Sequence, residues 1–299
     1  MKLKQFIFAL VAMLSSFAFT ANAQVAKVGN TEYATIDEAI AAWTNNTTLT
    51  LLDNVTLSDV IKLSSQEHHY LDLSTFTMTA ASSKNAIEIM SHGRGDRGER
   101  GALTITADAE NPGGINAGTQ KCIYYKYDAT LANDNYDRPI IYIKGGVFVG
   151  NSYSGINCSG HSSAQDKCAT FDISGGTFNC GLTLTKAKLL ISGGTFNNQV
   201  SCTGGGTSFR QISGGTFKSW TFMTADAPSK FWVGTSKSNY DVGVYVDDNG
   251  YLCVGGPVIT ELSPKYKAVA SNATKWSSYL AYSSAATNGL YYTNAEAAI

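Results

Sequence analysis

Charged residues are scarce in this 299-residue chain. They make up 15% of it, well below the roughly 25% usual for soluble domains. Basic and acidic residues number 22 and 23, and the net charge is −1. A balance this even gives no electrostatic attraction to a polyanion, which argues against nucleic acid or an anionic membrane surface as a partner.

Sequence patterns for metal, cofactor and nucleophile chemistry are missing as well. There is no C-x-x-C pair and no His at ligand spacing, so we expect no metal site. No nucleophile elbow or phosphate loop is present, and we expect no cofactor and name no catalytic residue. The acidic groups that could serve a polysaccharide-cleaving site are Asp134 and Asp137 with Arg138, and Asp166 and Lys167 with Asp172. A solvated loop explains each of them more simply.

The first 23 residues have the pattern of a secretory signal peptide. Lys2 and Lys4 form a basic start, residues 6–19 are mostly apolar, and Ala21-Asn22-Ala23 fits a cleavage site. The apolar run is too short for a confident membrane span. We therefore expect a secreted or cell-surface protein with no membrane span once the signal is removed.

One phrase recurs along the middle of the chain. KGGVF stands at 144–148 and ISGGTF at 173–178, 191–196 and 212–217, and the last three begin 18 and 21 residues apart. Short repeats at such a period indicate a solenoid of stacked coils. Alternating apolar and polar residues in short segments predict strands with one inward face. We assign residues 48–256 to a parallel β-helix.

The two glycines of the phrase have a structural role. Without them a strand would point Ile173 and Phe178 to opposite faces. Glycines can take positive φ and form a corner that resets the alternation, so that both side chains face inward. Stacked coils would then build inward ladders of Ile143, Ile173, Ile191 and Ile212 and of Phe148, Phe178, Phe196 and Phe217, with Ser174, Ser192, Ser213, Thr177, Thr195 and Thr216 outside.

The ends of the β-helix have their own signals. Residues 24–47 are predicted to cap it with a short helix, because Thr35 and Glu38 form a capping box before an apolar face of Ile36, Ala39, Ile40 and Trp43. Residues 257–288 are assigned to a linker or loosely packed segment. Residues 289–299 resemble the start of a further helix or module, which suggests a partial chain.

The segments VGNTEYATIDEAIAAW, TLTLLDNVTL and YLDLSTFTMTA, followed by the repeated ISGGTF, carry a family resemblance. They resemble right-handed parallel β-helix repeats of secreted and surface adhesin-like proteins of gut Bacteroidetes, whose fold is shared with pectate-lyase-like proteins. The resemblance covers roughly residues 28–256. It implies an all-β, right-handed parallel β-helix with a short N-terminal helix, and it specifies no activity.

Two groups of residues are candidates for binding. Arg94, Gly95 and Asp96 form the tripeptide that many integrins bind, in a Gly- and Arg-rich stretch that a charged flexible loop explains more simply. Tyr136 and Tyr153 lie in a tyrosine-rich region with neighbouring asparagines, and exposed rings there could stack on sugars. We expect recognition where the repeat is interrupted, at 91–101, 120–140 and 151–168, and not on the repeat itself.

Six cysteines in an exported chain permit disulfides. Cys158 and Cys168 flank a polar stretch, so a disulfide that closes this loop is one interpretation. Buried thiols stacked inside the coils are the other.

The sequence thus favours a binding protein that contacts an extracellular polysaccharide or a host surface protein. A polysaccharide lyase or glycoside hydrolase on the same scaffold is the first alternative. A structural surface spacer is the second.

Overall fold

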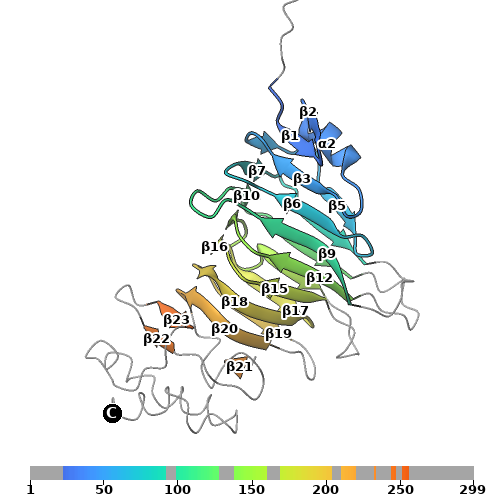
Figure 1. Cartoon of the computed structure of the whole chain (residues 1–299). Coiled ribbons are helices and arrows are strands. Elements are labelled where there is room, and N and C mark those ends of the chain that lie inside the picture. The colour runs from blue at the N-terminus through green and yellow to red at the C-terminus, as the bar shows by residue number, and fades with distance from the viewer. Residues whose placement is uncertain are drawn as a thin grey trace, which may run out of the picture.

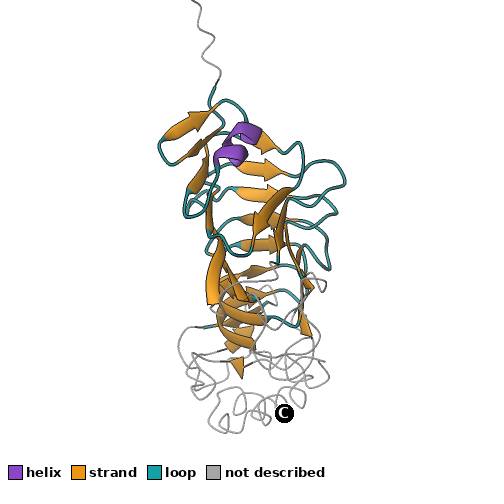
Figure 2. Ribbon diagram, turned by 90° about the vertical axis from the view of Figure 1, so that its right-hand side faces the viewer, coloured by secondary structure: helices purple, strands orange, loops and turns teal. Residues whose placement is uncertain are grey.

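The computed structural model describes residues 23–91, 99–127, 138–159, 169–203, 210–219, 232–233, 244–246 and 251–255. These residues form an all-β solenoid in which parallel strands stack coil upon coil (Figures 1 and 2). The predicted parallel β-helix is therefore confirmed. Residues 1–22 and 257–299, for which a signal peptide, a linker and a further module are predicted, lie outside the described residues.

Each complete coil contributes strands to three strips. The first strip contains β3 (Thr48–Leu51), β6 (His69–Asp72), β9 (Glu99–Thr106), β12 (Arg138–Ile143), β15 (Thr170–Ile173) and the starts of β18 (Lys188–Phe196) and β20 (Arg210–Phe217). The second contains β4 (Val55–Thr56), β7 (Thr77–Thr79), β10 (Gly114–Asn116), β13 (Val147–Val149), β16 (Thr177–Asn179) and the ends of β18 and β20. The third is a separate sheet of β5 (Ile61–Ser64), β8 (Ile87–Met90), β11 (Ile123–Lys126), β14 (Ile156–Ser159), β17 (Leu182–Thr185) and β19 (Val200–Thr203).

The core consists of ladders of like side chains along the stack. The rings of Phe148, Phe178, Phe196 and Phe217 lie 5.0, 4.7 and 4.8 Å apart between successive centroids, with interplanar angles of 8° or less. A second ladder pairs Ile143, Ile173, Ile191 and Ile212 in register. All eight side chains are buried. Both inward ladders expected from the repeat are confirmed.

The corner between the first two strips explains the glycine pair, with one correction. Gly194 has a φ of +101°, a conformation that side chains other than glycine rarely adopt. Gly193 does not share it, so the expectation of positive φ at both positions is wrong for the first glycine. A Cβ on Gly193 would instead overlap the carbonyl oxygen of Ser174 in the coil before. Gly194 therefore forms the corner, and Gly193 lets the coils stack closely.

The N-terminal cap has the predicted helix and a hairpin that the sequence did not predict. Helix α2 (Ile36–Ala42) begins after Thr35, whose Oγ1 accepts a hydrogen bond from the Glu38 amide at 3.3 Å. Its face of Ile36, Ala39 and Trp43 is buried, and Ile40 is half-buried against the core. Strands β1 (Ala26–Val28) and β2 (Thr31–Tyr33) pair antiparallel, and β1 also pairs antiparallel with β3, so this hairpin covers the free edge of the first strip.

At the other end, β21 (Trp232–Val233) pairs parallel with β20, whereas β23 (Leu252–Val254) pairs antiparallel with both β20 and β22 (Val244–Val246). None of the helices within the described ranges is long and apolar enough to cross a membrane.

A buried histidine under the cap gives a testable pH dependence. The His69 ring is 3% exposed, packs edge-on against Trp43 at 5.0 Å and lies 3.2 Å from a Glu67 carboxylate oxygen. Burial lowers the pKa of His69, although Glu67 opposes this shift. The unfolded chain, with an ordinary His pKa of about 6.5, then binds more protons than the folded chain below that pH.

We therefore expect the contribution of His69 to the free energy of unfolding to be complete above about pH 6.5. It should fall as the pH drops from there through the folded-state pKa of His69. Urea unfolding at a series of pH values measures this slope. His68, whose pKa burial also lowers, acts in the same direction. His69→Gln should therefore flatten the slope without abolishing it, and an unchanged slope would contradict the assignment to His69.

Candidate functional site

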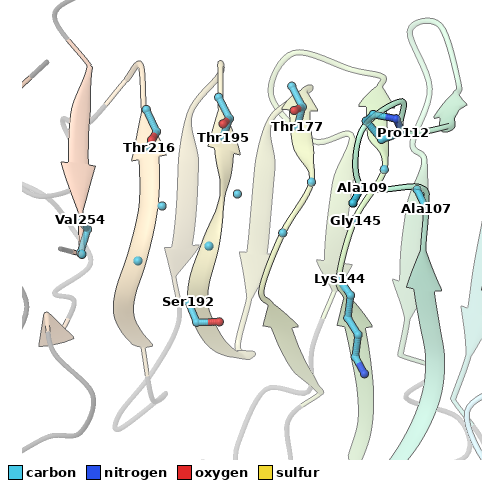
Figure 3. Close-up of a pocket in the computed structure, with 18 of the residues that line it drawn as sticks. Ala107, Ala109, Pro112, Lys144, Gly145, Thr177, Ser192, Thr195, Thr216 and Val254 are labelled. Atoms are coloured by element: carbon cyan, nitrogen blue, oxygen red, sulfur yellow. The ribbon is translucent and has the colours of Figure 1, made fainter. Parts of the chain in front are cut away.

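The glycine corners leave an open groove on the outside of the β-helix (Figure 3). Four successive coils present only backbone here, so no side chain fills the space between the first and second strips. The groove holds about 890 Å³, within the range of about 300–1,000 Å³ typical of ligand sites. The glycines that line it are Gly145, Gly146, Gly175, Gly176, Gly193, Gly194, Gly214 and Gly215.

Hydroxyl groups form the walls of the groove. Thr177, Thr195 and Thr216 stand side by side on the second strip, in register and on the same face (Figure 3). Ser192 and Ser213 lie on the opposite side, at the end of the first strip. Within the described part of the chain, the side-chain hydroxyls of Thr177, Thr195 and Ser192 have no hydrogen-bond partner. They can therefore bond to a ligand without first breaking an internal contact.

The two ends of the groove differ in character. At the end nearer the N-terminus lie Lys144 and the loop with Asp108, whose carboxylate accepts hydrogen bonds from the amides of Glu110 and Asn111 at 2.9 and 2.7 Å. At the other end lie Cys253 and Val254, where β23 closes the sheet. Lys144 and Asp108 are the charged residues among the described residues that line the groove, so its net charge is close to zero.

A titratable cluster adjoins the groove through Lys144. The Lys144 Nζ lies 5.9 Å from the centroid of the Tyr142 ring, and Tyr142 is paired in register with Asp172. Burial raises the pKa of Asp172, and the positive charge of Lys144 partly offsets this shift. Burial also lowers the pKa of His68, whose ring lies 6.2 Å from that of Tyr142. This edge can hydrogen-bond a polar ligand with one cation and one carboxylate.

Of the residues predicted to bind a ligand, the structure describes only Tyr153. Tyr153 lies on the turn between β13 and β14 and is 67% exposed. Arg94, Gly95, Asp96 and Tyr136 lie outside the described residues, so their roles remain predictions.

The cysteine predictions are tested only in part. Cys158 is buried in the coil interior and faces Leu184, which in turn faces the buried Cys202. Cys168, its predicted disulfide partner, lies outside the described residues, and this disulfide stays a prediction. Burial of the cysteines inside the coils is confirmed at Cys158 and Cys202, but these two do not stack on each other, because Leu184 lies between them.

The enzyme alternative also stays a prediction. Of its acidic candidates, only Asp172 is described, because Asp134, Asp137 and Asp166 fall in gaps between the described ranges. Within those ranges, no group of three His, Cys, Asp or Glu side chains is placed to hold a metal ion.

Sequence reasoning missed the groove, although it found the residues that form it. The outward Ser and Thr ladders were predicted, but the repeat was considered an improbable place for function. The signal was present in the repeat itself, because two adjacent glycines leave a gap of one side chain's depth between two rows of hydroxyls.

Comparison with known proteins does not assign this chain to a family. The chain matches no family model, no curated protein and no solved structure. Of the predicted resemblance, the structure shows the architecture, which consists of parallel strands in stacked sheets.

Proposed function

We propose that this protein is an exported or cell-surface binding protein that holds an extended extracellular polysaccharide in the groove over its glycine corners. The observation that carries the proposal is the groove itself, with a backbone floor and partner-free hydroxyls repeated on successive coils. Neighbouring strands lie about 4.8 Å apart, so the binding groups recur at regular short intervals along the stack.

The chemistry of the lining suits a hydroxyl-rich polymer. Ser and Thr hydroxyls both donate and accept hydrogen bonds, as sugar hydroxyls do. The near-zero net charge of the described lining gives no electrostatic preference for a polyanion. The absence of side chains on the floor lets a polymer lie close to the backbone. A neutral, unbranched polysaccharide meets these conditions, and the N-terminal signal pattern favours an extracellular ligand.

Blocking the groove tests this proposal. Thr195→Trp places a large ring between the walls without touching the buried core, since Thr195 faces outward. Thr185→Trp is the matched control, because Thr185 is also half-buried and outward-facing but lies on β17 in the third strip. The parent, both variants and their thermal unfolding would be compared, with binding read from an array of neutral and acidic glycans.

We expect the parent to bind neutral glycans and Thr195→Trp to lose at least about tenfold in affinity, the loss of a contact worth about 1.4 kcal/mol. Thr185→Trp should bind as the parent does. A parent that binds no glycan, or a blocked groove with unchanged binding, would overturn the proposal. Preferential binding of acidic polymers would overturn the assignment of a neutral ligand.

A further inference from the structure

Tyr153 is a solvent-exposed aromatic ring on a coil corner away from the groove. Tyr153 is 67% exposed. The other exposed large hydrophobic residue in the described part of the chain is Val149, four positions earlier, which is 37% exposed. An exposed tyrosine presents a flat apolar face together with a polar hydroxyl, a combination common at binding surfaces.

The turn that carries Tyr153 is held in place on both sides. The Asn151 Oδ1 accepts hydrogen bonds from the amides of Tyr153 and Ser154 at 2.9 and 3.0 Å. The Asn151 Nδ2 donates to the carbonyl of Thr119 in the preceding coil at 3.2 Å. In the following coil, the Thr183 hydroxyl donates to the Tyr153 carbonyl. The ring therefore stands on a fixed backbone, and little conformational entropy is lost when a ligand contacts it.

The backbone of the same turn packs on the next coil at Gly181. A Cβ on Gly181 would overlap the backbone of Ser152 and Tyr153. Two residues before Gly181, at the end of β16, lies the exposed Asn179, whose register partner in the preceding coil is Val149. The corner thus gathers Tyr153, Val149 and Asn179 on the outside of consecutive coils.

Asn179 is paired with the equivalent asparagine of the following coil. The Asn197 Nδ2 donates to the Asn179 Oδ1 at 2.7 Å. One amide–amide bond leaves an NH₂ group on one asparagine and a carbonyl oxygen on the other, whichever way the two amides are assigned. Within the described residues, neither side chain has a further partner. A donor and an acceptor therefore lie side by side at an exposed surface.

We propose that Tyr153, Asn179 and Asn197 form a second sugar subsite, distinct from the groove, that takes one pyranose ring with two adjacent hydroxyls. The apolar face of the pyranose ring packs on the Tyr153 ring. One hydroxyl accepts from the free amide NH₂ and its neighbour donates to the free amide carbonyl. The Thr177–Thr195 wall separates this subsite from the groove, since each asparagine follows its threonine by two positions, Asn179 at the end of β16 and Asn197 directly after β18.

Saturation-transfer NMR on the full chain tests the subsite with the methyl glycosides of glucose, galactose and mannose as probes. We expect the parent to transfer saturation to at least one glycoside, with an affinity that falls by about tenfold or more in Tyr153→Ala and in Asn179→Ala. Tyr153→Phe should retain most of the binding, since the ring face remains.

Two controls separate this subsite from other surfaces. Tyr124→Ala removes a different outward tyrosine, which is half-buried and lies on the third strip beneath Lys121, and this variant should bind as the parent does. A glycoside signal that Thr195→Trp removes and Tyr153→Ala leaves intact would place the binding in the groove and overturn the subsite, so the subsite and the groove can fail separately. No saturation transfer in the parent, or equal transfer in Tyr153→Ala, would overturn the subsite.

Discussion

Replacing Gly193 with alanine should lower the free energy of unfolding by about 3 kcal/mol, the upper range for overpacking in a well-packed structure. The backbone conformation of Gly193 is ordinary, so the cost is steric. The new Cβ meets the Ser174 carbonyl oxygen, and this carbonyl belongs to the preceding coil of the stack. Neither group can withdraw without separating the two coils. Urea-induced unfolding followed by far-UV circular dichroism measures the change.

Two other substitutions provide the controls for Gly193→Ala. Ser192→Ala alters the adjacent, exposed residue and should change stability by no more than about 0.5 kcal/mol. Gly118→Ala adds a Cβ in open space at a φ of +57°, so it should cost only the backbone strain of about 1 kcal/mol. A loss at Gly193 no larger than that at Gly118 would contradict the close stacking of coils at the corner.

Phe178→Ala should be as costly, at about 3–5 kcal/mol, as expected when a buried aromatic ring is removed. Phe178 is fully buried and lies between Phe148 and Phe196, at 5.0 and 4.7 Å, so the substitution removes two ring contacts and leaves a cavity inside the stack. The same unfolding measurement applies.

The size of the Phe178 effect can be divided between burial and stacking. Phe178→Leu keeps most of the apolar volume and should cost clearly less than Phe178→Ala. In a double-mutant cycle, Phe178→Ala and Phe196→Ala should show a coupling of about 0.5 kcal/mol or more, because their rings touch. Additive losses from the two positions would show that the aromatic ladder is not a cooperative unit.

The fold was predictable because the repeat encodes it at two levels. The spacing of the ISGGTF phrases indicated stacked coils, and the positions of Ile173 and Phe178 around the glycines indicated which side chains face inward. Both depend only on local alternation and period. The helix after Thr35 was predictable for the same reason, since its cap and apolar face are local signals.

The features that the sequence did not reveal depend on contacts between coils. The need for glycine at Gly193 comes from the Ser174 carbonyl of another coil, and the groove exists because four such corners are aligned. The pairing of Asn179 with Asn197 and the anchoring of the Tyr153 turn by Thr183 likewise join residues from different coils. Register between coils is set by the stack as a whole, so single-sequence patterns do not specify these contacts.

We propose the groove over the glycine corners as the polysaccharide-binding site. The most direct test is a crystal structure of the full chain with the oligosaccharide that the glycan array selects. We expect saccharide rings along the groove between Lys144 and Val254, with hydrogen bonds to the Thr177 and Thr195 hydroxyls. An oligosaccharide bound elsewhere on the β-helix, with the groove unoccupied, would contradict the claim.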